Sequence, residues 1–201
     1  SLPACIESEV QPVDVERDTV PSGLGQTDTG DGVESVDGSD ELPVAYPVLI
    51  NELVPVNRDS LVDLDGSSPD WIELINPHDH AIDVTDFGLS DDPGDPFQLV
   101  LPPVTLLPGQ VMLVRASGRD ESVNGHVHAP FKLDALGETV LLTAPDGRTH
   151  DRGETPRLYF DQSMGRDSES LAWVYYLNPT PLAENLTEGR PGFAAAPEIG
   201  P

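Results

Sequence analysis

Short apolar segments, rich in β-branched and aromatic residues and bounded by turn residues, recur between residues 48 and 177. They occupy residues 48–54, 70–76, 81–84, 87–90, 97–101, 110–115, 138–144 and 171–177. Several short segments of this kind, separated by turns, are typical of a β-sandwich or a barrel. No segment keeps helical spacing over several turns, and the 21 prolines would interrupt a helix that did. The sequence therefore predicts an all-β fold.

The segment at residues 70–76 has apolar side chains on both faces of the predicted strand. With a period of two, Trp71 and Ile75 share one face, and Ile72 and Leu74 share the other. A strand that is covered on both sides is a central strand of its sheet. Glu73 falls on the face of Trp71, either at an exposed edge or bonded to backbone donors, and the second situation is commoner in such a run.

Composition divides the chain into three parts. Residues 1–45 contain eleven acidic residues against the single base Arg17, together with Gly, Ser, Pro and Thr runs and no aromatic residue. Such a segment cannot bury enough apolar surface to offset its ordering entropy, so we expect a disordered acidic linker. Residues 46–186 carry nearly all the large apolar side chains and form the predicted domain. Residues 187–201 form a Gly/Pro-rich tail or linker.

Charge restricts the partners of the chain. The net charge is −26, and Lys132 is the only lysine among the ten basic residues. A field of this sign repels phosphate backbones and anionic lipid surfaces. We therefore expect no nucleic-acid partner.

Cys5 is the only cysteine, which excludes an intramolecular disulfide. The preceding Leu2, Pro3 and Ala4 resemble the cleavage site of a bacterial lipoprotein signal peptide, after which the cysteine is lipidated. The alternative is a free cysteine in a disordered tail. No run of about 18 apolar residues predicts a membrane span. We expect a secreted or cell-surface location outside the cytoplasm, with membrane contact only through a lipid anchor at Cys5.

Several multi-residue motifs, in order, resemble the lamin tail domain. In the first half they are NE (residues 51–52), DWIELINP (70–77), IDV (82–84) and FGLSDD (87–92). In the second half they are LPGQ (107–110), FKL (131–133), GETVLL (137–142), PDG (145–147), SMGR (163–166) and PTPLAEN (179–185). The closing motif has Leu182 where the family usually has glycine.

This resemblance implies an immunoglobulin-like β-sandwich. The chain has no heptads and no basic patch, so it looks like the bacterial branch of the family, found in secreted and surface proteins, and not like the animal filament proteins. The resemblance brings no catalytic residues. We expect a non-catalytic binding or structural module, displayed on a bacterial surface by the acidic tether, with a protein or polysaccharide partner. The alternative is an accessory domain of a larger secreted hydrolase or nuclease.

Acidic loops are the candidate metal sites. Asp63, Asp65 and Asp70 surround Gly66 and offer hard oxygen ligands at a spacing that calcium loops use. The alternative is a solvated surface loop without an ion. A second, less regular acidic group is a weaker calcium candidate and contains Asp86, Asp91, Asp92 and Asp95. We expect no other cofactor.

Two histidine pairs and two aromatic residues complete the candidates. His78 with His80, and His126 with His128, have strand spacing for a transition metal, but both pairs lie in turn-like contexts that favour packing or hydrogen bonding. No Gly-x-Ser-x-Gly elbow is present, so we expect no enzyme activity. Trp173 and Tyr175 are candidates for binding a sugar ring, and their alternative role is to anchor the core.

Overall fold

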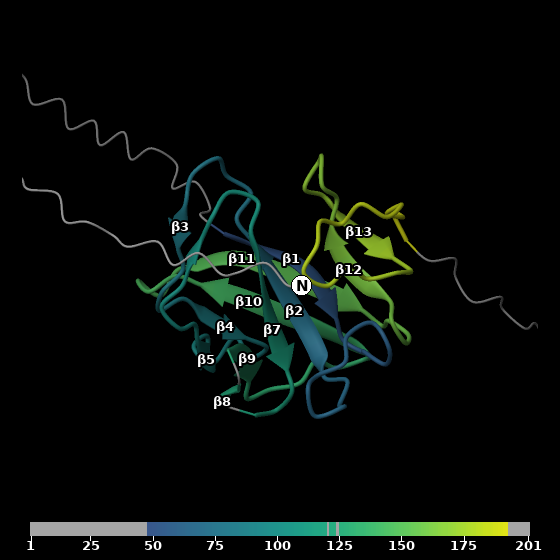
Figure 1. The fold of residues 1–201 in the computed structure, drawn as a ribbon, viewed down its shortest axis with the longest axis horizontal. Helices are drawn as coiled ribbons and strands as arrows, with labels where there is room; N and C mark the ends of the chain where they lie inside the picture. Colours follow the sequence, from purple (N-terminus) through teal and green to yellow (C-terminus); the bar gives the residue numbers. More distant parts are fainter. Residues whose placement is uncertain (1–47, 120, 124, 193–201) are drawn as a thin grey trace, which may run out of the picture. The chain divides into compact units, whose positions relative to one another are not determined.

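The computed structural model describes residues 48–119, 121–123 and 125–192, and every regular element in these residues is a β-strand (Figure 1). The predicted all-β fold is therefore confirmed. No described element is a helix long and apolar enough to cross a membrane. The predicted acidic linker at residues 1–45 and the lipidation site at Cys5 lie outside the described residues.

Most strands belong to two sheets, and a third small sheet has two strands. The larger sheet has seven strands, in the spatial order β13 (Trp173–Tyr176), β12 (Ser163–Arg166), β1 (Leu49–Val54), β2 (Asp70–Ile75), β7 (Val111–Ala116), β9 (His126–Ala129) and β8 (Glu121–Val123). The second has four, in the order β11 (Thr149–Pro156), β10 (Gly137–Thr143), β4 (Gly88–Ser90) and β5 (Leu99–Val100). The small sheet pairs β3 (Ile82–Asp83) with β6 (Thr105–Leu106).

One continuous hydrophobic core joins the two larger sheets. Ile50, Ile72 and Val114 enter it from the seven-stranded sheet, and Leu89 and Leu142 enter it from the four-stranded sheet. In Figure 1 the arrows of β10 and β11 cross those of β2 and β7 in projection. This layering of two sheets around one core is that of a β-sandwich.

Strand β2 is the middle strand of the larger sheet, between β1 and β7, as predicted. Its Ile72 and Leu74 face the main core, while Trp71 packs on the opposite face with Val54 and Leu113. The side chains of Trp71, Ile72 and Leu74 are fully buried. Both faces of β2 are covered by other parts of the domain, which explains why the strand has apolar side chains on both faces.

Each of the eight predicted segments contains a strand, and five further strands lack a clear sequence signal. These are β6, β8, β9, β11 and β12. The turn-like context predicted for His126 and His128 is wrong, because both lie on β9. Strand β9 pairs with β7 in parallel and places His128 beside Arg115. This non-local pairing positions the candidate site.

Candidate functional site

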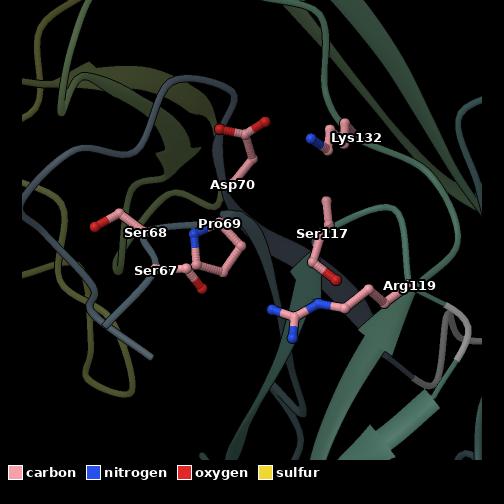
Figure 2. A pocket seen from close by; sticks show the side chains of 8 residues that line it. Ser67, Ser68, Pro69, Asp70, Ser117, Arg119 and Lys132 are labelled. Atoms are coloured by element: carbon pink, nitrogen blue, oxygen red, sulfur yellow. The ribbon is translucent and has the colours of Figure 1, made fainter. Parts of the chain in front are cut away.

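A cavity of about 300 Å³ opens where the loop after β1 meets the end of β7 (Figure 2). Its wall contains Ser67, Ser68, Pro69, Asp70, Ala116, Ser117, Arg119 and Lys132. Figure 2 shows the Lys132 ammonium pointing towards the Asp70 carboxylate, with Ser117 and Arg119 on the neighbouring wall. In a chain with ten basic residues and a net charge of −26, two basic residues and three hydroxyl groups thus line one cavity.

The charged side chains that line the cavity neutralise one another only in part. Arg119 bonds through Nη1 to Asp65 Oδ2 at 3.2 Å. Lys132 makes no hydrogen bond or ion pair within the described residues, and its charge acts on Asp70. Burial raises the pKa of Asp70 to about 6, although the backbone N–H groups of Asn57 and Leu133 and the charge of Lys132 lower it. Lys132 is therefore the cation most accessible to a ligand in this cavity.

Asp63 lies behind the cavity at the centre of a cluster of basic side chains. Its Oδ1 lies 3.2 Å from Arg115 Nε, and its Oδ2 lies 3.8 Å from Arg119 Nη2. The Nδ1 atom of His126 is 3.4 Å from Oδ1, and the Nε2 atom of His128 is 3.5 Å from Oδ2. Burial raises the pKa of Asp63, but the N–H of Leu64, Arg115 and the two histidines outweigh it, so the pKa lies below its ordinary value. Asp63 is therefore an ionised, buried anchor.

His128 connects this anchor to the cavity, because its Nδ1 lies 3.0 Å from the Oγ of the cavity residue Ser117. The structure thus brings together the hydroxyl, imidazole and carboxylate that nucleophilic catalysis requires, an arrangement that the sequence did not reveal. The Asp63 carboxylate favours a positive charge on the His128 imidazole, whereas Arg115 and Arg119, which share this carboxylate, oppose it. His128 is only 1% exposed and bridges Ser117 and Asp63. The expected lack of enzyme activity stays a prediction.

The three predicted calcium ligands face different partners. Asp63 faces the basic cluster, Asp65 Oδ1 accepts bonds from the N–H and hydroxyl of Ser67, and Asp70 Oδ1 accepts a bond from the N–H of Asn57 at 3.2 Å. No three His, Cys, Asp or Glu side chains in the described part of the chain form a group that could hold a metal ion. Calcium binding here stays a prediction.

In the second acidic group, several carboxylates bind their own loop. Asp92 Oδ1 accepts a bond from the N–H of Gly94 at 2.7 Å, and Asp91 Oδ1 accepts one from the side chain of Gln98 at 2.7 Å. Asp86 has a positive φ of 62°, and Asp95 donates its N–H to the carbonyl of Asp92. The contacts of Asp91, Asp92 and Asp95 shape the turn between β4 and β5, whereas Asp86 lies before β4.

The remaining candidates lie elsewhere on the domain. The rings of His78 and His80 lie 5.3 Å apart in a loop after β2. Trp173 and Tyr175 on β13 are half-buried and pack against the main core. The Arg166 guanidinium lies 4.4 Å from the centre of the Trp173 ring, so one face of this ring already has a stacking partner. Sugar binding by Trp173 and Tyr175 stays a prediction.

Two fully buried glutamates occupy directly paired positions on β1 and β2. An irregularity between Ile50 and Glu52 shifts the register, so that Glu52 lies opposite Glu73. Burial raises the pKa of each carboxyl to about 7, against the lowering effect of their hydrogen-bond donors. The sequence favoured backbone donors for Glu73; the N–H of Leu182 is such a donor, but the second donor is the side chain of Asn51. The sequence did not indicate that a second carboxylate lies beside Glu73.

No protein-family model matches this sequence. A search of curated proteins finds no relative either.

Proposed function

We propose that residues 46–186 form a non-catalytic binding module that works outside the cytoplasm, and that the cavity beside Lys132 receives a carboxylate group of its partner. The partner is a protein or a polysaccharide. The gathering of Lys132, Arg119 and three serine hydroxyls around one cavity carries this proposal. The resemblance of the sequence motifs to the bacterial branch of the lamin tail domain supports the role of a surface-displayed, immunoglobulin-like binding module.

The chemistry of the wall favours a single carboxylate over a long polyanion. A cation and several hydroxyl groups can donate charge-assisted hydrogen bonds to carboxylate oxygens. The net charge of −26 repels an extended polyanion at long range, and salt screens this repulsion. Asp70, with its pKa raised to about 6, becomes more negative as pH rises and would then compete with the ligand for Lys132.

Calorimetric titration of the full chain with a short oligogalacturonate and with a short acidic peptide tests this proposal. Both carry carboxylates, and the one that binds identifies the source. We expect Lys132→Gln to weaken binding at least about tenfold, which corresponds to the loss of a charge-assisted bond. Arg152→Gln is the matched control, because it removes a positive charge from an exposed position on β11. The proposal would be rejected if neither probe bound, or if Lys132→Gln and Arg152→Gln lost the same affinity.

A further inference from the structure

The segment of residues 179–190, which follows β13, lies against the buried glutamate pair; we refer to it as the strap. It contains no strand, and its only sheet-like contact is a bridge between Arg190 and Tyr175 among the described residues. Asn185 attaches it further, since its side-chain amide donates to the carbonyl oxygens of Asn51 at 3.3 Å and Arg166 at 2.9 Å. The strap is therefore fixed by side-chain contacts and one bridge, and not by a continuous ladder of backbone hydrogen bonds.

Each glutamate of the pair binds the sheet with one oxygen and the strap with the other. Glu52 Oε1 accepts the hydroxyl of Ser163, and its Oε2 accepts the N–H of Thr180 at 3.1 Å. Glu73 Oε1 accepts the amide of Asn51 at 2.7 Å, and its Oε2 accepts the N–H of Leu182 at 2.6 Å. Two backbone N–H groups of the strap thus depend on these two carboxylates.

Among the residues that the structure describes, no positive charge compensates the pair directly. The hydrogen-bond donors to the two carboxylates are neutral hydroxyl, amide and backbone N–H groups, and each carboxylate faces the other. The phenol of Tyr176 on β13 is also close enough for the charge of Glu52 to act on it, since burial, Asp167 and Glu52 together raise the pKa of Tyr176. The nearby cations are already paired, Arg166 on β12 with Asp151 and Arg115 on β7 with Asp63. The strap's own acids, Glu184 and Glu188, are exposed to solvent.

We propose that Glu52 and Glu73 act as a pH-sensitive latch, which holds the strap while the pair retains a proton and releases it when both carboxylates are ionised. Two adjacent negative charges without a counter-ion need water. The strap is the cover whose removal admits that water, because it contributes no strand to either sheet. Because the pKa of each group is raised to about 7, we expect the strap to be held at pH 5 and released as pH rises through about 7.

Release of the strap would uncover apolar surface. Leu182 forms part of the wall of a cavity of about 410 Å³, together with Val104, Met112 and Leu113. Tyr176, which is 1% exposed, lies beneath the strap at Gly189, where an added Cβ would lie 3.3 Å from its ring. The latch would therefore couple pH to the exposure of an apolar face on this side of the domain.

Amide hydrogen exchange of the full chain, followed by NMR between pH 5 and 8.5, tests the latch. We expect the protection factors of the Thr180 and Leu182 amides to fall at least about tenfold between pH 5 and 8, since each unit of raised pKa corresponds to a factor of ten. The amide of Leu74 in the centre of β2 should change less, which separates local release from global unfolding.

Glu73→Gln should remove most of this pH dependence, because a neutral amide mimics the protonated acid and the side chain of Asn51 can turn to accept from it. Glu154→Gln, at an exposed position on β11, is the matched control and should behave as the wild type. Equal protection of Thr180 and Leu182 at pH 5 and pH 8 in the wild type would overturn the proposal, whatever the variants do. Retention of the full pH dependence by a folded Glu73→Gln variant would also overturn it.

Discussion

Asp63 and Arg115 form an ion pair in which Oδ1 and Nε lie 3.2 Å apart and the two side chains are only 6% and 7% exposed. The contact is ionic, because the Arg115 Nε–H has no hydrogen-bond acceptor in the described part of the chain. Removal of one member leaves the other charge buried, which is costly. We therefore expect Asp63→Asn to reduce the free energy of unfolding by about 3 kcal/mol, measured by urea denaturation at pH 7.

Asp65→Asn provides the comparison within the same loop. Asp65 also bonds to an arginine, but its side chain is 52% exposed, and solvent screens such pairs. We expect no measurable change in the urea midpoint. Similar losses in the two variants would show that loop geometry, and not the buried charge pair, sets the stability of this region.

Leu182 adopts a left-handed conformation, with φ at 62°, that side chains other than glycine rarely take. We expect Leu182→Gly to raise the free energy of unfolding by about 0.5 kcal/mol, since relief of strain outweighs the backbone entropy cost of glycine. Leu182→Ala keeps the strain and loses contacts, so it should destabilise. Urea denaturation of both variants checks this prediction, and a lower stability of the glycine variant would contradict it.

Arg166 joins the two sheets of the sandwich. Its Nη2 bonds to both carboxylate oxygens of Asp151 on β11, at 2.7 and 2.9 Å, and its Nε donates to the carbonyl of Ile50 on β1 at 2.9 Å. Lysine keeps the charge but cannot make these divergent bonds or stack on Trp173. We expect Arg166→Lys to cost about 2 kcal/mol in urea denaturation. A loss no larger than that of Arg148→Lys, at an exposed hairpin position, would contradict this role.

The glutamate pair predicts how global stability depends on pH. The folded-state pKa of Glu52 is raised from 4.5 to about 7, so its favourable contribution is complete below about pH 4.5 and is lost as pH rises through 7. Glu52→Gln removes this loss, because the Ser163 hydroxyl can accept from the amide. We compare the free energy of unfolding of the variant with that of the wild type. We expect this difference to be about 2 kcal/mol larger, in favour of the variant, at pH 8 than at pH 5. If the free energy of unfolding changed with pH in the same way in the wild type and in Glu52→Gln, the raised pKa would be contradicted.

Much of the fold could be predicted because local patterns were strong. The two-faced apolar pattern around Trp71 and the turn residues that bound the short apolar segments, such as Pro108 and Gly109, both follow from short-range sterics and burial. In the structure, Gly109 has φ at 69°, as a type II turn needs. Strand β11 lacked such a signal, because its residues are mostly polar and only Gly153 and Thr155 are buried.

The candidate sites depend on contacts between residues distant in sequence, and these were not predictable. His128 meets Asp63 only because β9 pairs in parallel beside β7. Glu52 lies opposite Glu73 only because β1 is irregular at Asn51. One local signal was available at the strap. The motif that residues 179–185 resemble usually has glycine where this chain has Leu182, and glycine there indicates a positive φ, which Leu182 adopts.

Lys132 is the only lysine of the chain and lies in the wall of the cavity. Amine-directed reagents such as succinimidyl esters therefore have one side-chain target, and that target is the candidate site itself. A fluorophore or a sensor surface attached through this amine would block the ligand it is meant to report. Conversely, selective acylation of Lys132, read out by mass spectrometry in the presence and absence of a carboxylate, would provide a footprint of occupancy at a single atom.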